Sequence, residues 1–362
     1  MKRIQLALTL VTLGILSACK PAQKDPPFDY GYLRKDAKVD ALTIGADNPI
    51  QIVGAPSLWP KTTGKLPDGN RVRIAVIGTG VDYTIPDLRD ALWLNVGEAD
   101  EKTRANSADD DGNGMKDDII GYDFYSGDGL PYDWHGHDTF TASLIASTAK
   151  NYQAAGVVGV APNAELMIVR YISPDGDIDS MTGPIDAAAS IEYAVTNGAR
   201  VIYFNYPEGG FGELSDLVVD AIIEAGKKNV LVVVPAGNSG NLKVAGFVRS
   251  LTTMAHVIIV AGLDAQGKIL LTSNSGRNLA TLAAPVADAV GYLPGNRVMK
   301  TPFETTSIAA AYVTGAAALV MSLPQKGSAA KVKLELMSHI QANKDQPPLN
   351  VLAGGALSLK DF

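Results

Sequence analysis

Short apolar runs rich in β-branched residues alternate with amphipathic or Ala-rich stretches through most of the chain. Two of these stretches, Ile185–Asn197 and Leu217–Lys228, carry helical spacing and are followed by Gly or Asn stop signals, and Ile308–Leu323 is an Ala-rich helix candidate. Alternation of strand and helix predicts an α/β fold in three layers, a doubly wound, mostly parallel sheet with helices on both faces. The predicted buried strands are Arg71–Ile77, Ala164–Tyr171, Val201–Phe204, Val230–Val234 and Val257–Val260.

The amino terminus has the features of an export signal. A basic start is followed by an apolar run, Ile4–Leu16, which is shorter than the roughly 20 residues that a membrane-spanning helix needs. The run ends in Leu-Ser-Ala-Cys, which resembles the lipobox of bacterial lipoproteins and implies cleavage before Cys19 and its acylation; the alternative is that Cys19 is incidental. Lys20 follows in place of the aspartate that usually retains such proteins at the inner membrane. We therefore expect an exported lipoprotein, anchored in the outer membrane and facing the periplasm or the outside.

Composition narrows the remaining choices. The chain is 46% hydrophobic, which excludes a largely disordered protein, and its net charge of -7 argues against a nucleic-acid partner. Cys19 is the only cysteine, so the chain has neither an internal disulfide nor a cysteine-based zinc site. The sequence does not predict an oligomeric state. We expect a lipoprotein signal peptide at 1–18, a Pro-rich tether and lead-in at 19–68, one main domain at 69–341 and a loose C-terminal tail at 342–362.

Four segments of the chain carry recognisable motifs. They are Ile74–Leu88 (IAVIGTGVDYTIPDL), His137–Ala146 (HDTFTASLIA), Pro235–Gly240 (PAGNSG) and Thr305–Gly315 (TTSIAAAYVTG). Together they resemble the subtilisin-like serine proteases (subtilases, S8), in the order that this family uses. The resemblance implies a subtilisin-like peptidase domain at 69–341, peptide or protein substrates, hydrolysis of peptide bonds and no organic cofactor.

The resemblance assigns three catalytic roles. Ser307 matches the nucleophile, which needs a positioned base because a serine hydroxyl is a poor nucleophile at neutral pH. His137 matches that base, whereas the neighbouring His135 fits the pattern less well. Asn238 matches the donor to the oxyanion of the tetrahedral intermediate. The alternatives from the residues alone are that Ser307 only caps a helix and that Asn238 is a turn residue.

The acid of the triad is missing at its usual place. The family carries an aspartate directly after its first strand, where this chain has Gly78. That carboxylate orients the histidine, and its loss costs about 10⁴-fold in kcat, or about 5–6 kcal/mol. We therefore expect a protease of low activity or, alternatively, a pseudoprotease that acts as a peptide- or protein-binding lipoprotein. Asp138 and Asp133 are candidate substitutes, and a Gly78→Asp change is expected to raise hydrolysis by orders of magnitude.

An acidic loop before the histidine segment reads DDDGNGMKDD. Its oxygens follow part of a calcium-loop pattern, although Ile120 stands where the bidentate glutamate would be. The sequence predicts a structural calcium site, with a solvated surface turn as the alternative. The candidate ligands are Asp109, Asp111, Asn113, the Met115 carbonyl, Asp117 and Asp118.

Overall fold

The computed structural model describes residues 24–29, 35–39, 42–207, 210–324, 327–341 and 348–362. The expected signal peptide and Cys19 lie outside the described residues. Within those ranges, no helix is both long and apolar enough to cross a membrane.

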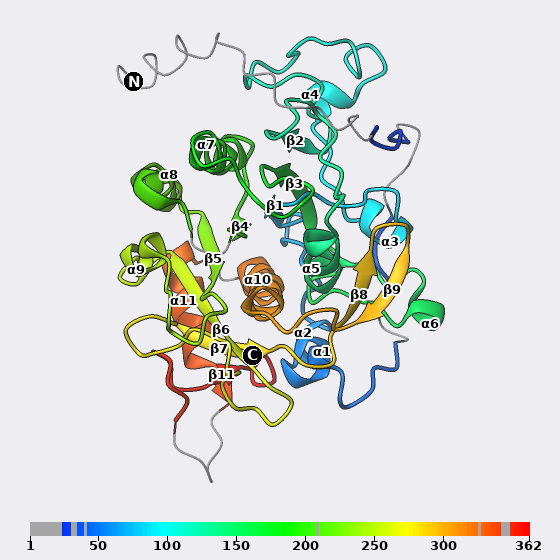
Figure 1. Cartoon of the computed structure of the whole chain (residues 1–362). Coiled ribbons are helices and arrows are strands. Elements are labelled where there is room, and N and C mark those ends of the chain that lie inside the picture. The colour runs from blue at the N-terminus through cyan, green and yellow to red at the C-terminus, as the bar shows by residue number, and fades with distance from the viewer. Residues whose placement is uncertain (1–23, 30–34, 40–41, 208–209, 325–326, 342–347) are drawn as a thin grey trace.

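A nine-stranded sheet forms the centre of the protein (Figure 1). Its strand order is β10-β11-β7-β6-β5-β4-β1-β3-β2, and all neighbours are parallel except β10 and β11. The strands are β1 (Arg73–Gly78), β2 (Gly121–Asp123), β3 (Glu165–Arg170), β4 (Val201–Phe204), β5 (Leu231–Pro235), β6 (Val257–Leu263), β7 (Leu282–Pro285), β10 (Ile340–Gln341) and β11 (Ala356–Leu357). An antiparallel hairpin, β8 (Val290–Leu293) and β9 (Arg297–Lys300), lies outside this sheet.

Helices cover both faces of the sheet, which confirms the predicted α/β class. One face carries α7 (Gly183–Thr196), α8 (Ser215–Lys227) and α9 (Gly246–Leu251), and the other carries α5 (His137–Ala146), α10 (Thr306–Ser322) and α11 (Ala329–Ser338). The shorter helices are α1 (Pro49–Ile52), α2 (Ala55–Leu58), α3 (Pro86–Arg89), α4 (Val96–Ala99), α6 (Tyr152–Ala155) and the single 3₁₀ turn Gly212–Leu214.

Side chains of β1 show how the core is divided. Ile74 and Val76 pack in the cluster beneath α5 and α10, while Ala75 and Ile77 pack in the cluster beneath α7 and α8. Successive residues of a strand point to opposite faces, so a strand buried on both sides reads as a continuous apolar run. This explains why the five predicted strands are found close to their expected bounds.

The carboxyl end of the chain corrects one expectation. Residues 342–362 were expected to form a loose tail, but within the described part of that range Ala356 of β11 pairs with Ala283 of β7. Leu357 and Leu359 are buried, and the amide of Leu359 donates to the carbonyl of Val53. Residues 348–362 therefore belong to the main domain, because they extend its sheet and bury apolar side chains.

The described part of the lead-in also packs onto the domain. Tyr83 donates a hydrogen bond to the Pro26 carbonyl at 2.6 Å, and the indole of Trp134 donates to Asp25 at 2.8 Å. The Phe28 ring meets Tyr83 edge to face at 5.8 Å. Residues 25–28 are thus held against Trp134, which lies three positions before His137 in the sequence.

Candidate active site

The carboxyl ends of β1 and β4 meet at one edge of the sheet, where the chain reverses its winding direction. Ile77 of β1 lies beside Phe204 of β4, and Asn205 donates its backbone amide to the Ile77 carbonyl. The chain runs from β1 to β2 and β3 on one side of β1, then returns to add β4 through β7 on the other side. Doubly wound folds bind ligands at such an edge.

Two helices begin at this edge and present the candidate base and nucleophile. His137 is the first residue of α5, after Gly136, whose φ of 98° suits glycine. Ser307 is the second residue of α10 and is 5% exposed. Helix amino termini favour negative charge, so this position suits a hydroxyl that develops anionic character during attack.

Asp138 supplies a carboxylate to the His137 ring. Its Oδ1 lies 2.6 Å from Nδ1 of His137, and its Oδ2 accepts a hydrogen bond from the Thr79 amide at 2.7 Å. The Asp138 side chain is fully buried. A buried carboxylate needs such donors, and Nδ1–H of the ring is one of them. The Nδ1 atom is therefore the protonated one, and Nε2 is left to accept a proton.

Gly78 leaves the space that this carboxylate occupies. A Cβ atom added at Gly78 would lie 2.0 Å from Oδ2 of Asp138 and 3.1 Å from Cβ of Asn205. A contact of 2.0 Å is impossible without movement of the carboxylate. The expectation that Gly78→Asp alone would raise hydrolysis is therefore corrected, because Asp138 already fills that space.

Asp133 does not reach the ring. Its Oδ1 accepts from the amides of His135 and Gly136, and its Oδ2 accepts from the amide and hydroxyl of Thr139. Burial raises the pKa of Asp133, and the negative charge of Asp138 raises it further. Asp133 thus shapes the turn into α5, and Asp138 is the acid that contacts His137.

Two hydrogen bonds fix the side-chain oxygen of Asn238. Its Oδ1 accepts from the amide of Thr306 at 2.8 Å and from the hydroxyl of Thr306 at 3.0 Å. Because a backbone N–H can only donate, the oxygen must face Thr306. Among the described residues the nitrogen of this amide has no acceptor, so it is free to donate to a ligand in the pocket that Asn238 shares with Ser307.

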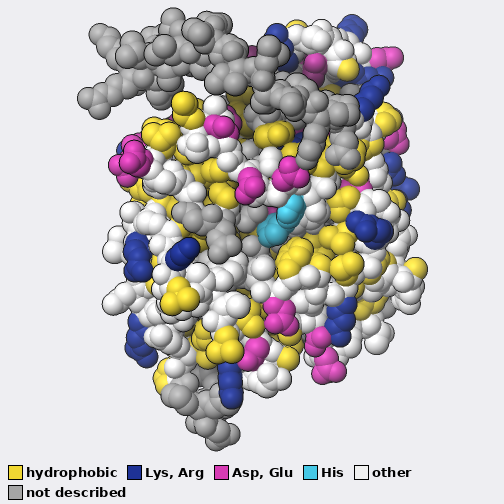
Figure 2. All heavy atoms as spheres, viewed as in Figure 1, with side chains coloured by type: hydrophobic (Ala, Val, Ile, Leu, Met, Phe, Trp, Pro, Cys, Tyr) yellow, Lys and Arg dark blue, Asp and Glu magenta, His cyan; other side chains and the backbone are white. Residues whose placement is uncertain are grey.

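Asn205 connects the pocket to the histidine. It lines the pocket that contains Ser307 and Asn238, and its Nδ2 lies 3.3 Å from Nδ1 of His137. Within the described part of the chain no hydrogen bond joins the hydroxyl of Ser307 to the ring of His137; catalytic hydrogen bonds are often long before substrate binds. Figure 2, which has the same view as Figure 1, shows histidine side chains in cyan near the middle of the visible face.

Three further residues support the site and were not singled out from the sequence. The hydroxyl of Thr79 accepts a hydrogen bond from the Asp138 amide at 3.1 Å. The amide of Thr306 donates a hydrogen bond to Oδ1 of Asn238. Phe303 stacks on the His137 ring with centroids 5.3 Å apart and planes 5° apart. Thr79 and Thr306 adjoin the motif positions 78 and 307, which is a usable signal, whereas nothing in the sequence marks Phe303.

The acidic loop gathers a different set of oxygens from the one expected. Carboxylate oxygens of Glu98, Asp109 and Asp111 all lie within 4.8 Å of one another. Glu98 is buried, and its Oε2 has no hydrogen-bond partner. Oxygen-only donors and an unpartnered buried carboxylate oxygen suit a hard cation such as calcium. Glu98 was missed because it lies eleven residues before the DDDGNG pattern.

The other expected ligands differ in how they relate to this cluster. Asp118 accepts hydrogen bonds from Asn95, Asn113 and the Tyr193 hydroxyl, so it borders the cluster. Asn113 turns its Nδ2 toward the acids, and its Oδ1 accepts the Met115 amide. The Asp117 carboxylate instead accepts the amides at 106 and 107. Met115 packs its side chain against the core beneath α7.

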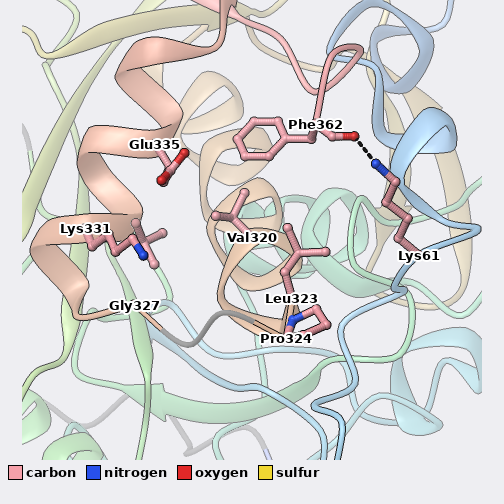
Figure 3. Close-up of a pocket in the computed structure, with 9 residues that line it drawn as sticks. Lys61, Val320, Leu323, Pro324, Gly327, Lys331, Glu335 and Phe362 are labelled. Carbon is pink, nitrogen blue, oxygen red and sulfur yellow. Dashed lines mark hydrogen bonds between the residues drawn. The ribbon is translucent and has the colours of Figure 1, made fainter.

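A separate apolar pocket of about 340 Å³ lies between the end of α10 and α11, and it contains none of the candidate catalytic residues (Figure 3). The Lys61 ammonium there donates to the Phe362 carbonyl. The lining residues are Lys61, Val320, Leu323, Pro324, Gly327, Lys331, Val332, Glu335 and Phe362.

Two known serine proteases are similar to this chain in sequence. The "Major intracellular serine protease" of Bacillus subtilis (strain 168) is 29% identical over 277 residues, which cover 76% of this chain and 75% of the relative. The "Thermophilic serine proteinase" of Bacillus sp. (strain AK1) is 32% identical over 265 residues, 73% of this chain and 54% of the relative. The chain thus spans three quarters of the first relative and about half of the second.

A solved structure shares the fold. The prenylagaramide maturation protease PagA superposes with a TM-score of 0.59 at 23% identity, covering 84% of this chain and 94% of that one. The pattern of the subtilase family (Peptidase S8) matches residues 69–354, well over half of the sequence. The chain therefore belongs to the subtilase family of serine proteases.

Proposed function

We propose that this chain is an active serine endopeptidase in which Asp138, adjacent to the base, takes the role of the triad acid. One observation carries the proposal: the Asp138 carboxylate lies against His137 Nδ1 in the space that a side chain at Gly78 would need. The expectation of low activity rested on an imidazole without an acid. The contact at 2.6 Å removes the reason for that expectation.

The residues divide the reaction among them. Ser307 Oγ attacks the substrate carbonyl while Nε2 of His137 takes its proton, and Asp138 stabilises the imidazolium that forms. The Nδ2 of Asn238 donates to the oxyanion, an interaction worth about 3–4 kcal/mol in enzymes of this kind. His137 then protonates the leaving amine, and water releases the acyl group from Ser307 by the reverse steps.

Two variants compared with the unchanged protein test the relocated acid. Asp138→Gly removes the carboxylate that contacts the ring and is expected to lower kcat by about 10⁴-fold. The double variant Gly78→Asp/Asp138→Gly moves the carboxylate to the family's usual position and is expected to recover to within about tenfold of the unchanged protein, since the electrostatic contact returns. Equal activity of the unchanged protein and Asp138→Gly would refute the role of Asp138.

A fluorophosphonate probe tests the nucleophile itself. We expect labelling of the purified protein that disappears in Ser307→Ala, because only an activated serine reacts with the probe. Absence of labelling in the unchanged protein, with the fold intact by circular dichroism, would favour the alternative of a pseudoprotease that binds peptides or proteins without cleaving them.

The acidic loop supports a proposal of structural calcium. Glu98, Asp109 and Asp111 would hold the ion, with Asp118 bordering it. Calcium would neutralise carboxylates whose crowding otherwise disfavours the folded loop. It has no step in peptide hydrolysis, since the loop and the Ser307 pocket share no lining residue.

The proposed location is the outer membrane, through an acylated Cys19. Support comes from the lipobox-like sequence alone. Metabolic labelling with a palmitate analogue tests it: we expect incorporation that is lost in Cys19→Ala, and incorporation that persists would contradict the proposal.

A further inference from the structure

The recess beside Ser307 is small. It holds about 60 Å³ and is bounded by the ends of β4 and β5, the start of α10 and a segment that includes Lys243. A carbonyl under attack must contact both Ser307 and Asn238, and both of these residues line the recess. The recess therefore adjoins the residue that carries the carbonyl and can receive its side chain. That statement rests on the proposed function. The lining residues are Asn205, Tyr206, Pro235, Gly237, Asn238, Ser239, Lys243, Ala245, Asn274, Thr306 and Ser307.

Tyr206 limits the size of the recess. Its hydroxyl donates to the Pro235 carbonyl at 3.0 Å, so the side chain crosses from the end of β4 to the end of β5. Its ring packs edge to face on buried Phe247 with centroids 4.8 Å apart. Held at both ends, Tyr206 occupies space that an aromatic or long substrate side chain would need.

The polar lining of the recess is mostly satisfied internally. Oδ1 of Asn274 accepts from the Ser239 hydroxyl and the Asn241 amide, and its Nδ2 donates to the Ala236 carbonyl. The Ser239 hydroxyl also accepts from the backbone amide of Lys243. These groups therefore have little capacity left for a substrate side chain.

Two lining groups differ from these: the Nδ2 of Asn238, which the proposed mechanism assigns to the oxyanion, and the Lys243 ammonium. Lys243 is the one charged residue in the lining of this recess, and among the described residues its ammonium has no acidic partner. A cation at the rim of a small recess favours an anionic side chain and disfavours a cationic one. Its position therefore adds a charge preference to the size limit set by Tyr206.

We infer that the enzyme selects aspartate as the residue on the amino-terminal side of the scissile bond, with Tyr206 setting the size and Lys243 the charge. The aspartate side chain has four non-hydrogen atoms, and 60 Å³ corresponds to roughly four to six water-sized spheres. Phenylalanine exceeds that space, and alanine leaves the charge of Lys243 uncompensated.

Hydrolysis of peptide p-nitroanilides that differ only in their last residue tests the inference. We expect kcat/KM for Asp to exceed that for the isosteric Asn by roughly fivefold, the upper range for an exposed ion pair, and Phe to be a poor substrate.

Variants of Lys243 and Tyr206 test the two residues that set this preference. Lys243→Gln should bring Asp and Asn substrates to equal kcat/KM, and Lys243→Glu should favour Asn. Lys268 is an exposed lysine outside the recess, so Lys268→Gln should leave the preference for Asp over Asn unchanged. Tyr206→Ala should admit Phe. Preferred cleavage after Phe or Lys by the unchanged protein, or an Asp preference that survives Lys243→Gln, would overturn the inference.

Peptide binding to Ser307→Ala separates this inference from the proposed function. We expect the Asp-ending peptide amide to bind roughly fivefold more tightly than its Asn counterpart by fluorescence anisotropy, and this difference to vanish when Lys243→Gln is added. Selective binding without any hydrolysis by the unchanged protein would refute the proposed peptidase activity while supporting the selection of aspartate by the recess. Hydrolysis with no preference for Asp would support the peptidase activity and refute the selection of aspartate.

Discussion

Two regions of this protein contain buried carboxylates that are stabilised in opposite ways. At the active site, both oxygens of Asp138 have donors from the protein itself, the His137 ring and the Thr79 amide. In the acidic loop, Oε2 of Glu98 is buried without a donor and lies among the oxygens of Asp109 and Asp111. The first region is complete without an added ion, whereas the second requires a cation or a proton. Asp138 therefore replaces the acid that was expected at position 78. The buried oxygen of Glu98 has no such donor among the described residues.

The largest expected effect comes from filling the space at Gly78. Gly78→Ala adds a Cβ that would lie 2.0 Å from Oδ2 of Asp138, so the carboxylate must leave the ring. We expect kcat to fall by up to about 10⁴-fold, as when the acid is removed. Gly45→Ala is the matched control, since a Cβ there meets nothing within 4 Å. A Gly78→Ala enzyme with unchanged steady-state kinetics would show that Asp138 does not serve His137.

Removal of calcium comes next in size and should affect stability alone. At calcium concentrations about 100-fold above Kd, a chelator should lower the free energy of unfolding by about 3 kcal/mol and the Tm by about 5–10 °C. Glu98→Gln should abolish most of this dependence. Glu101→Gln, at an exposed acid three residues away, should preserve it. A melting temperature that ignores both calcium and chelator in differential scanning calorimetry would contradict the calcium site.

A smaller effect should appear when pH is varied in the presence of chelator. Burial raises the pKa of Asp118 to about 6, and the charges of Asp111 and Glu98 contribute to this rise. A raised folded-state pKa means that the folded protein favours protonated Asp118. This contribution to stability is complete at pH values below the ordinary pKa of 3.8, and it is lost as the pH rises through about 6. The stability of the unchanged protein relative to Asp118→Asn should therefore fall by on the order of 2 kcal/mol between those pH values, measured by urea denaturation.

Calcium should reverse that trend, because the ion binds only ionised carboxylates and its contribution grows with pH. A stability difference that stays flat with pH in chelator would show that Asp118 keeps its ordinary pKa in the folded protein.

The smallest effect concerns Ser143, which belongs to the packing around the active-site helix. Its hydroxyl donates to the Thr139 carbonyl at 2.7 Å and accepts from the buried Tyr292 amide at 3.0 Å. Ser143→Ala leaves that amide unsatisfied, and we expect a loss of about 1–2 kcal/mol in unfolding free energy with kcat unchanged. Ser338→Ala, at an exposed serine that donates a similar bond within α11, should cost less. Equal costs for the two variants would remove Tyr292 from the explanation.

The central strands and long helices were predictable because their signals are local. β4 has the predicted bounds, and α7, α8 and α10 begin within two residues of theirs. The elements that were missed, such as β7 and β11, are short or Ala-rich and form only by pairing with distant strands. The same reason explains the incorrect prediction of a loose tail.

The candidate site was predictable in its motifs and not in its acid. Neighbouring residues on a helix point in different directions, so Asp138 beside His137 carries no strong signal of contact. The contact exists because His137 is the first residue of α5 and because Gly78, sixty positions earlier, has no side chain. That coincidence of two distant positions is visible only in the folded chain.

The attachment of residues 25–28 to Tyr83 and Trp134 would limit the distance between the domain and a lipid surface if Cys19 is acylated as proposed. Asp25 lies six positions after Cys19, and a fully extended chain over those six steps spans at most about 22 Å. With Cys19 acylated as proposed, the backbone of Asp25 stays within that distance of the acylated residue, and Trp134, three positions before the candidate base His137, is hydrogen-bonded to the Asp25 side chain. Polypeptides emerging from or lying along the bilayer would thus be cut in preference to those diffusing in bulk.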